Sequence, residues 1–489
     1  MTRQTPPAYM EAYKEAFVAE TAEFIHAYDT AHVVMLGEAG VLPAETALAL
    51  LDGLAEMERA GIAVCRSAAG GGNHAGERHL TATLGASVGG AIGLARSSGD
   101  LSAISFRMYA RDAALRLRRR VLLLRRAMLA FSASHRDSVF AGNTHGQHAQ
   151  PITFALWAMM YHDALARDGE RLAAFGARAN WCPAGAGIMA GTGFPINRKR
   201  VADLLGFDGV IPNTLDAALS HDLEIEYASV LNALCYTLSR MAEDVFMWNT
   251  TEHSLVTLPD WFIGASSMMP QKRNPDGLQD LRNLSAQSQA ALTMVMGTER
   301  GPTGYAIIER RNPDRALRAL TEGVIERLEV LPDLLAEMRI DTERAEAHAN
   351  ANWASVTDIA SAIVTLNGIE WRRAHHIVKG FVRDCIASGL APSEVTADHF
   401  NAYASRCGEF SVLLNDAILT RALDARAFIN RRETFGGPGP EAMEAAMDSA
   451  THRIAMEADN IDDLAARFAK AAESLAAVVS STLKTRKFA

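Results

Sequence analysis

Three long stretches of the chain place apolar residues at alternating spacings of three and four. The clearest is the segment 223–250, where seven apolar side chains follow this spacing. They are Tyr227, Leu231, Leu234, Leu238, Met241, Val245 and Trp248. Because an α-helix completes a turn in about 3.6 residues, such spacing puts all of these side chains on one face. The segment therefore predicts a long helix packed in a bundle.

Two further segments, 117–131 and 320–338, repeat the pattern. Their apolar positions are Leu117, Val121, Leu124, Met128 and Phe131 in the first and Leu320, Val324, Leu328, Leu331, Leu335 and Met338 in the second. Pro332 is expected to kink the second helix. Alternating apolar and polar runs bounded by turn residues, which would indicate strands, are nearly absent. The fold is predicted to be all-α.

The chain has 489 residues, of which 49% are hydrophobic and 21% charged, as in ordinary globular proteins. This length predicts two to four structural units. Loops rich in glycine and proline punctuate the helical segments. We expect an N-terminal helical domain over 1–105, a central domain of long helices over 106–350 and a C-terminal helical domain over 351–489.

The charge balance and the cysteines indicate the cellular compartment and the class of binding partner. With 57 acidic and 48 basic side chains the net charge is −9, which argues against a protein that coats nucleic acid or an anionic membrane. The 5 cysteines are scattered without a CxxC pair, as is typical of a reducing compartment. The first residues lack a basic start followed by an apolar run. We expect a cytoplasmic protein that acts on a small molecule.

The segment GASSMMPQKRNP (264–275) concentrates Ser266, Ser267, Lys272 and Asn274 on an irregular stretch before a helical run. Neither an SxxK motif nor a GxSxG elbow surrounds the serines, so the usual serine acyl-enzyme chemistry is not indicated. A lysine, an amide and the start of a helix together suit a carboxylate or a developing carbanion. The other interpretation is a solvated loop.

A second polar segment, NTHGQHAQP (143–151), carries Thr144, His145, Gln147 and His148. The two histidines are three residues apart, but no third ligand accompanies them in a metal-binding pattern. We therefore expect no metal at this segment. A plain capping loop is the alternative interpretation of this segment.

Two further loops carry weaker signals. The stretch GAGIMAGTG (185–193) lacks GxGxxG spacing and no strand precedes it, so a turn is favoured over a nucleotide site. The stretch RSSGD (96–100) precedes a helical run, with Ser97 or Ser98 as a candidate N-cap.

Several motifs together resemble the argininosuccinate lyase family of the fumarase and aspartase superfamily. They are, in chain order, AHVVMLGEAGVL, THGQHAQPITF, PAGAGIMAGTGFPINR, NTLDA, GASSMMPQKRNP, TDIASAIV, WRRAHHIV and FGGPGPEA. The SSxMPxKxNP pattern is a specific signature of the superfamily, and the resemblance runs through most of the chain.

The resemblance implies a homotetramer of three-domain helical subunits whose long helices form a 20-helix bundle. Each active site would collect loops from three subunits and use no metal or organic cofactor. The reaction would eliminate an amine from an N-substituted aspartate and leave fumarate. The partners would be this small substrate and further copies of the chain.

Roles follow by position in the family motifs. Ser266 would be the base, and Lys272 and Asn274 would hold the carboxylate that accumulates charge. Thr144 would bind a substrate carboxylate, and His145 would protonate or orient the leaving amine. The remaining residues expected to bind substrate are Arg96, Ser97, Gln147, Ser267, Tyr305 and Arg310.

The chain departs from the family pattern at three places. Gln279 stands where relatives carry a glutamate that pairs with the histidine, which favours a neutral role for His145. Gly99 replaces an asparagine of the RSRNDQ loop. The segment YAIIERRNP (305–313) keeps the tyrosine but introduces Arg310 and Arg311 in place of acidic and glutamine residues.

These departures bear on the substrate. Basic side chains would favour carboxylates over a guanidinium on the leaving-group half. We therefore expect an enzyme similar to the lyases that cleave ethylenediaminedisuccinate and other aminopolycarboxylates. The alternatives are argininosuccinate lyase proper and a non-catalytic structural protein of the crystallin kind.

Overall fold

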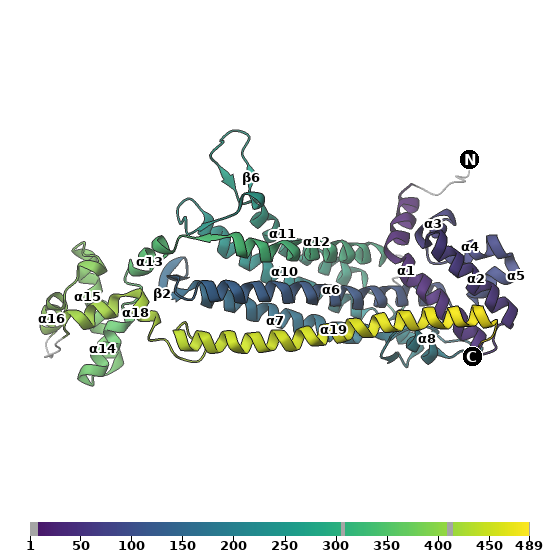
Figure 1. The fold of residues 1–489 in the computed structure, drawn as a ribbon. Coiled ribbons are helices and arrows are strands. Elements are labelled where there is room, and N and C mark those ends of the chain that lie inside the picture. Colours follow the sequence, from purple (N-terminus) through teal and green to yellow (C-terminus); the bar gives the residue numbers. More distant parts are fainter. Residues whose placement is uncertain (1–7, 305–308, 408–413, 489) are drawn as a thin grey trace.

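The computed structural model describes residues 8–304, 309–407 and 414–488, and these fold mainly into α-helices. The all-α prediction is confirmed. Long helices form an elongated bundle with a cluster of short helices at each end (Figure 1). The bundle helices are α6 (Ser98–Ser134), α7 (Phe154–Ala179), α10 (Asp222–Asn249), α11 (Asp276–Thr298), α12 (Arg311–Glu337) and α19 (Pro440–Thr485).

The bundle helices bury the apolar stripes predicted from the sequence. All seven stripe residues of α10 are buried, with Tyr227, Leu231 and Leu234 at 0% exposure. The stripes of α6 and α12 join them in one core, and Pro332 lies inside α12. Because these faces meet one another, the bundle is held mainly by burial of apolar surface.

A second core lies at one end of the bundle and is built from the N-terminal helices. These are α1 (Ala8–Glu38), α2 (Ala44–Ala60), α3 (Ile62–Ala68), α4 (Ala75–Leu84) and α5 (Ala86–Gly89), followed by the 3₁₀ turn Gly90–Gly93. Two short helices, α8 (Arg198–Leu204) and α9 (Thr214–Leu219), lie in the segment between α7 and α10. The start of α6 joins this core, which places its first turn where the two cores meet.

A third core lies at the opposite end (Figure 1). The helices at this end are α13 (Thr342–Asn350), α14 (Thr357–Asn367), α15 (Trp371–Ala387), α16 (Ala397–Arg406), α17 (Asp416–Leu423) and α18 (Ala425–Ile429), with a 3₁₀ turn at Pro392–Glu394. Helix α19 then leaves this end and runs back along α6 to reach the N-terminal core, where Leu475 is buried. Packing therefore separates α19 from the rest of the expected 351–489 domain.

In the part of the chain that the structure describes, the strands form four two-stranded pairs. They are β1 (Val139–Thr144) with β2 (Gln147–Thr153), β3 (Trp181–Cys182) with β4 (Gly209–Val210), β5 (Val256–Thr257) with β8 (Arg339–Ile340), and β6 (Gly264–Ala265) with β7 (Arg273–Asn274). Only the β3–β4 pair is parallel. A 3₁₀ turn at Asp260–Phe262 precedes β6. The β6–β7 hairpin projects from the side of the bundle (Figure 1).

Across the described residues, the search for membrane-spanning segments found no helix with the length and apolar character that crossing a bilayer requires.

Candidate active site

The first candidate segment, 143–151, forms most of a hairpin, where the sequence had indicated only a loop. Thr144 pairs with Gln147, so His145 and Gly146 are the two turn residues, with φ of 56° and 68°. Two residues of positive φ match the twist of the flanking strands in a tight hairpin. Positive φ is uncommon for a residue other than glycine, and such positions cluster at functional sites. Thr144, His145 and Gln147 are all exposed at this tip.

The second candidate segment forms the loop of the β6–β7 hairpin. Gly264 pairs with Asn274 and Ala265 with Arg273, which leaves Ser266 to Lys272 as the loop between the strands. The backbone N–H of Met269 donates to Ser266 Oγ at 3.1 Å. Ser267 and Lys272 are exposed, and Ser266 is half-buried. A hydroxyl that accepts a backbone donor is better able to carry negative charge than a free one.

Asp276 lies at the base of this hairpin. A Cβ on Gly264 would overlap the carboxylate of Asp276, so only glycine permits this close approach. Asp276 also begins α11, where a carboxylate interacts favourably with the N-terminal partial charge. Gln279 is exposed one turn further along. The loop and the start of α11 are thus tied together.

The third candidate segment, the turn Arg96–Ser98, leads into α6. Ser97 is the N-cap of α6 in a capping box with Asp100, whose Oδ2 accepts the N–H of Ser97 at 2.8 Å. The other oxygen of Asp100 accepts the backbone N–H of Ala186 at 2.9 Å. Capping by Ser97 is confirmed, and Asp100 joins this turn to the 185–193 loop.

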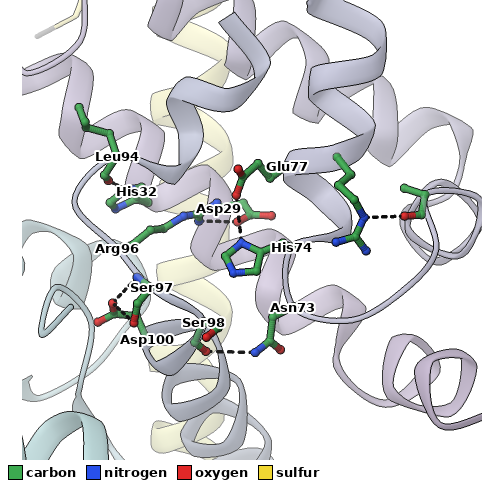
Figure 2. A network of polar contacts seen from close by, with 12 residues as sticks. Asp29, His32, Asn73, His74, Glu77, Leu94, Arg96, Ser97, Ser98 and Asp100 are labelled. Atoms are coloured by element: carbon green, nitrogen blue, oxygen red, sulfur yellow. Dashed lines mark hydrogen bonds and ion pairs between the residues drawn. The ribbon is translucent and has the colours of Figure 1, made fainter. Parts of the chain in front are cut away.

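Arg96 lies beneath the turn rather than on its surface. Its side chain is 1% exposed and donates to Asp29 Oδ1 at 2.6 Å (Figure 2). Arg66 binds the other oxygen of Asp29. Burial alone would raise the pKa of Asp29, but the two guanidinium groups outweigh it and lower that pKa. Arg96 therefore supports the turn from below, and its side chain is not accessible to solvent.

His32 lies beside this ion pair. Burial lowers the pKa of His32 to about 3, and the charge of Arg96 acts in the same direction. Its Nε2–H donates to the carbonyl of Leu94 at 2.9 Å, just before the turn (Figure 2). His32 is therefore a neutral donor that fixes the chain leading to Arg96.

A cavity of about 420 Å³ opens beside the turn. Its lining includes Ser98 and Gly99 from the start of α6, His221 from the start of α10, Glu299 from the end of α11 and Arg310 from the start of α12. A cavity of this size falls within the range of small-molecule sites.

The charged side chains of the cavity form a chain of contacts. Arg310 donates to both oxygens of Glu299, at 2.8 and 3.0 Å, and contacts Nε2 of His221. Because arginine only donates, Nε2 of His221 accepts and its Nδ1–H donates to Glu224 at 2.7 Å. Arg310, which the sequence predicted to bind substrate, is thus held by Glu299 and His221.

The sequence analysis did not single out Asp29, His221 or Glu299. Each is an isolated acidic or histidine residue in a helical segment, and no local motif marks it. The signal that pointed to them was the arginines themselves, because a guanidinium that folding buries requires a carboxylate or another acceptor as its partner: Arg96 for Asp29, and Arg310 for Glu299 and His221. Tyr305, also expected to bind substrate, lies outside the described residues.

The three candidate segments lie far apart in one chain. The turn at Ser97 and the β1–β2 hairpin flank the two ends of α6, whose 37 residues span about 55 Å at roughly 1.5 Å per residue. The 6 residues of β1 reach about 20 Å at roughly 3.3 Å per residue. His145 therefore cannot approach Ser97 of its own chain. The β6–β7 hairpin projects at a third position (Figure 1).

Within the described ranges, no cluster of three or more His, Cys, Asp and Glu side chains could hold a metal ion.

Comparison with known proteins identifies the family. A family model described as lyase matches residues 7–289, and one described as argininosuccinate lyase C-terminal matches residues 353–430. Argininosuccinate lyase of Methanosarcina mazei is 31% identical over 466 residues, which cover 93% of this chain and 92% of that protein. This chain belongs to the argininosuccinate lyase family. It is an enzyme of the carbon–nitrogen lyase class.

Solved structures agree with this membership of the argininosuccinate lyase family. EDDS lyase in complex with formate matches with a TM-score of 0.88 at 29% identity, over 99% of this chain and 97% of that chain. Fumarate lyase from Mesorhizobium sp. BNC1 matches with a TM-score of 0.69 at 17% identity, over 92% of this chain and 99% of that chain. The second likeness shows a shared fold alone.

Proposed function

We propose that this chain eliminates an amine from an N-substituted aspartate and releases fumarate, with Ser266 as the base. The observation that carries this proposal is the β6–β7 loop, which presents a Ser266 hydroxyl that accepts a backbone donor, six residues before Lys272. Family membership supports the class of reaction, and the name of the EDDS lyase variant with bound fumarate supports the product.

The chemistry requires a base and a carboxylate clamp. Ser266 Oγ acts as its alkoxide, which Lys272 and the backbone donor stabilise. It takes the proton from the carbon next to a carboxylate and becomes the neutral hydroxyl, and the electron pair moves into that carboxylate as an aci-carboxylate. Lys272 and Asn274 stabilise its extra charge, together with the start of α11. The pair then returns to form the carbon–carbon double bond as the carbon–nitrogen bond breaks. Ser267 lies beside the base on the same loop.

The β1–β2 hairpin would complete the site. Thr144 and Gln147 offer donors for a second carboxylate, and His145 supplies or orients the proton for the departing nitrogen. With Gln279 at the position where relatives carry the glutamate that pairs with the histidine, His145 works as a neutral donor. Ser97 contacts substrate from the turn that Arg96 supports.

We propose a homotetramer in which each site takes its three segments from three subunits. The separation of about 55 Å along α6 supports this, because one chain cannot bring its own hairpin to its own turn. The exposed apolar side chains on the bundle helices support it as well, among them Tyr236, Met247 and Met296. Such exposed apolar surface is typical of faces covered by a partner.

The proposal is tested by incubating the purified protein with a panel of N-substituted aspartates and following fumarate by its ultraviolet absorbance. Ser266→Ala should lower turnover by roughly 100- to 10,000-fold, the usual contribution of a positioned base. Ser267→Ala is the matched control and should lose far less. A Ser266→Ala variant with more than about a tenth of wild-type turnover would place the base elsewhere.

A second candidate is argininosuccinate lyase proper, which the names of the relatives favour. It predicts that argininosuccinate saturates the enzyme with release of arginine at an ordinary enzymatic rate.

A further inference from the structure

The cavity beside the Arg96–Ser98 turn shows which leaving amine the site fits. We propose that it receives an uncharged, apolar substituent on the leaving nitrogen, so that the preferred substrates are N-alkyl or N-arylalkyl aspartates. This inference rests on the proposed function. It departs from the expectation of a carboxylate-bearing amine, which was based on the presence of Arg310 in the sequence.

The first argument is that the charge of Arg310 is already satisfied. Glu299 accepts two hydrogen bonds from the guanidinium, and the side chains of Arg310 and Glu299 are only 19% and 10% exposed. Nε2 of His221 accepts a further hydrogen bond from Arg310, and Nδ1 of His221 donates to Glu224. A substrate carboxylate would have to displace a buried partner of Arg310 before binding it, which costs the desolvation of that partner.

The second argument is that the acidic groups of the cavity are paired as well. Arg318 donates to Asp314 at 3.3 Å and packs over the ring of Tyr109. Glu224 is bound by His221 and Glu299 by Arg310, so each of the three acidic residues in the lining has a basic partner. An added charge on the leaving amine would be buried without a counter-charge, which is unfavourable for either sign.

The third argument is that apolar side chains make up much of the remaining lining, beside polar residues such as Asn73 and Ser102. Phe106, Leu219, Val295 and Leu317 contribute buried surface from four different helices. Ile188 adds an apolar side chain that is 47% exposed and so is open to contact with a ligand. These side chains stabilise a ligand only through burial of apolar area.

The fourth argument links Ile188 to Gly99. A Cβ on Gly99 would lie 3.4 Å from Cδ1 of Ile188 and 3.2 Å from Ser97 Oγ, so any larger side chain would crowd the isoleucine. Glycine at this position therefore leaves the space beside Ile188 open for an apolar group.

The test uses three succinates that carry the substituent through carbon, so that no amine can leave. They are 2-(4-methylpentyl)succinate, which is neutral, 2-(3-carboxypropyl)succinate, which adds an anion, and 2-(3-amidinopropyl)succinate, which adds a cation of the same shape. Affinities are measured by titration calorimetry on the intact protein. The neutral compound should bind at least about tenfold more tightly than either charged one, because burying a charge without a partner is strongly unfavourable. Equal or tighter binding of a charged compound would overturn the proposal.

Glu299→Gln tests the role of Glu299 as the residue that sets specificity. Loss of the carboxylate frees the charge of Arg310, so binding of the carboxypropyl compound should rise by roughly 10- to 100-fold relative to the methylpentyl compound. Glu322→Gln is the matched control, because it breaks an exposed arginine–glutamate pair outside the cavity. If the ratio of the two affinities is the same in Glu299→Gln as in the wild type, Glu299 does not prevent Arg310 from binding a carboxylate of the ligand.

Ile188→Ala gives a second variant that leaves the ion pairs intact. It should weaken binding of the methylpentyl compound by roughly threefold to tenfold and leave the carboxypropyl compound unchanged, since it removes only apolar contact. Equal effects on both compounds would contradict an apolar site.

Turnover of the matching N-substituted aspartates separates this inference from the proposed function. If no member of the panel gives fumarate while the order of affinities holds, the proposed function fails and the cavity assignment stands. Fumarate formation with the charged substrates preferred would overturn the inference alone.

Discussion

Arg96 donates a hydrogen bond to Asp29 at 2.6 Å, and the two side chains are only 1% and 2% exposed. The carboxylate comes from the middle of α1 and also binds Arg66 of α3, while Arg96 precedes the cap of α6. Because Arg96 is bound to Asp29 of α1, the position of the Arg96–Ser98 turn depends on α1. The turn that carries Ser97 is thereby fixed by residues that do not reach the substrate.

Asp29→Asn should destabilise the protein by about 3–5 kcal/mol, because it leaves two buried guanidinium groups without their counter-charge. Thermal unfolding of the purified variant measures the loss. Asp52→Asn is the matched control, since Asp52 pairs with Arg486 at an exposed site, where such pairs contribute about 0–1 kcal/mol. Equal melting temperatures for Asp29→Asn and the wild type would show that this ion pair does not hold the N-terminal helices together.

The same variant tests positioning. If Asp29 acts through Arg96 on the turn, the folded Asp29→Asn enzyme at low temperature should show a raised KM with a smaller change in kcat, because uniform binding is lost. A purely structural role would reduce the active fraction and leave KM unchanged.

Mixed tetramers test whether the sites are shared. His145→Ala and Ser266→Ala proteins are each expected to be inactive, and hybrids formed by reversible dissociation should regain activity at up to roughly a quarter of the sites. The reason is that a site drawing its hairpin and its loop from different subunits can receive one intact copy of each. No recovery in hybrids of verified composition would place both segments in one subunit.

Gln279→Glu tests the state of His145. A carboxylate near the imidazole favours its charged form, so the acidic limb of the pH–rate profile should move to higher pH. Gln289→Glu, an exposed position on α11 about 15 Å further along at roughly 1.5 Å per residue, is the control and should not move the limb. An unmoved limb in Gln279→Glu, together with full activity of His145→Ala, would remove both residues from proton transfer.

His32 predicts a loss of stability in mild acid. Its pKa is about 3 in the folded chain against an ordinary value of 6.5, so the unfolded state binds the proton first. Stability should therefore fall as the pH drops below 6.5 and level off near 3, with roughly 2 kcal/mol lost between pH 7 and pH 5. Asp29 does not contribute to the change between pH 7 and pH 5, because its pKa is lowered from an ordinary value of 3.8.

His32→Gln keeps a donor for the Leu94 carbonyl and removes the titration. Melting temperatures of this variant should change less between pH 7 and pH 5 than those of the wild type. His452→Gln, an exposed position on α19, should keep the wild-type dependence. The same pH dependence in His32→Gln would assign the acid sensitivity to other groups.

The sequence by itself determined the helical class and the long bundle helices. Positions such as Leu231 and Val324 repeat at the helical period, and that period alone decides which side chains share a face. The capping of α6 by Ser97 was also readable, because a cap bonds within three residues of itself. The candidate loops were found for a similar reason, since glycine and proline end helices locally.

The two hairpins were not readable from the sequence. Strands of two to seven residues rich in glycine and polar side chains carry no period, and their pairing depends on the partner strand. The positive φ of His145 is a consequence of that pairing. Only the folded chain shows that Ser266 accepts the N–H of Met269.

The tertiary structure alone decided which charges are free. Arg96 and Arg310 read as two substrate-binding cations in the sequence, yet Asp29 lies 67 residues from the first and His221 lies 89 residues from the second. Local spacing cannot reveal such partners, because ion pairing depends on which helices meet. A buried guanidinium is stable only where a carboxylate reaches it, and packing decides whether that carboxylate comes from a distant helix, as Asp29 does for Arg96, or from the preceding one, as Glu299 does for Arg310.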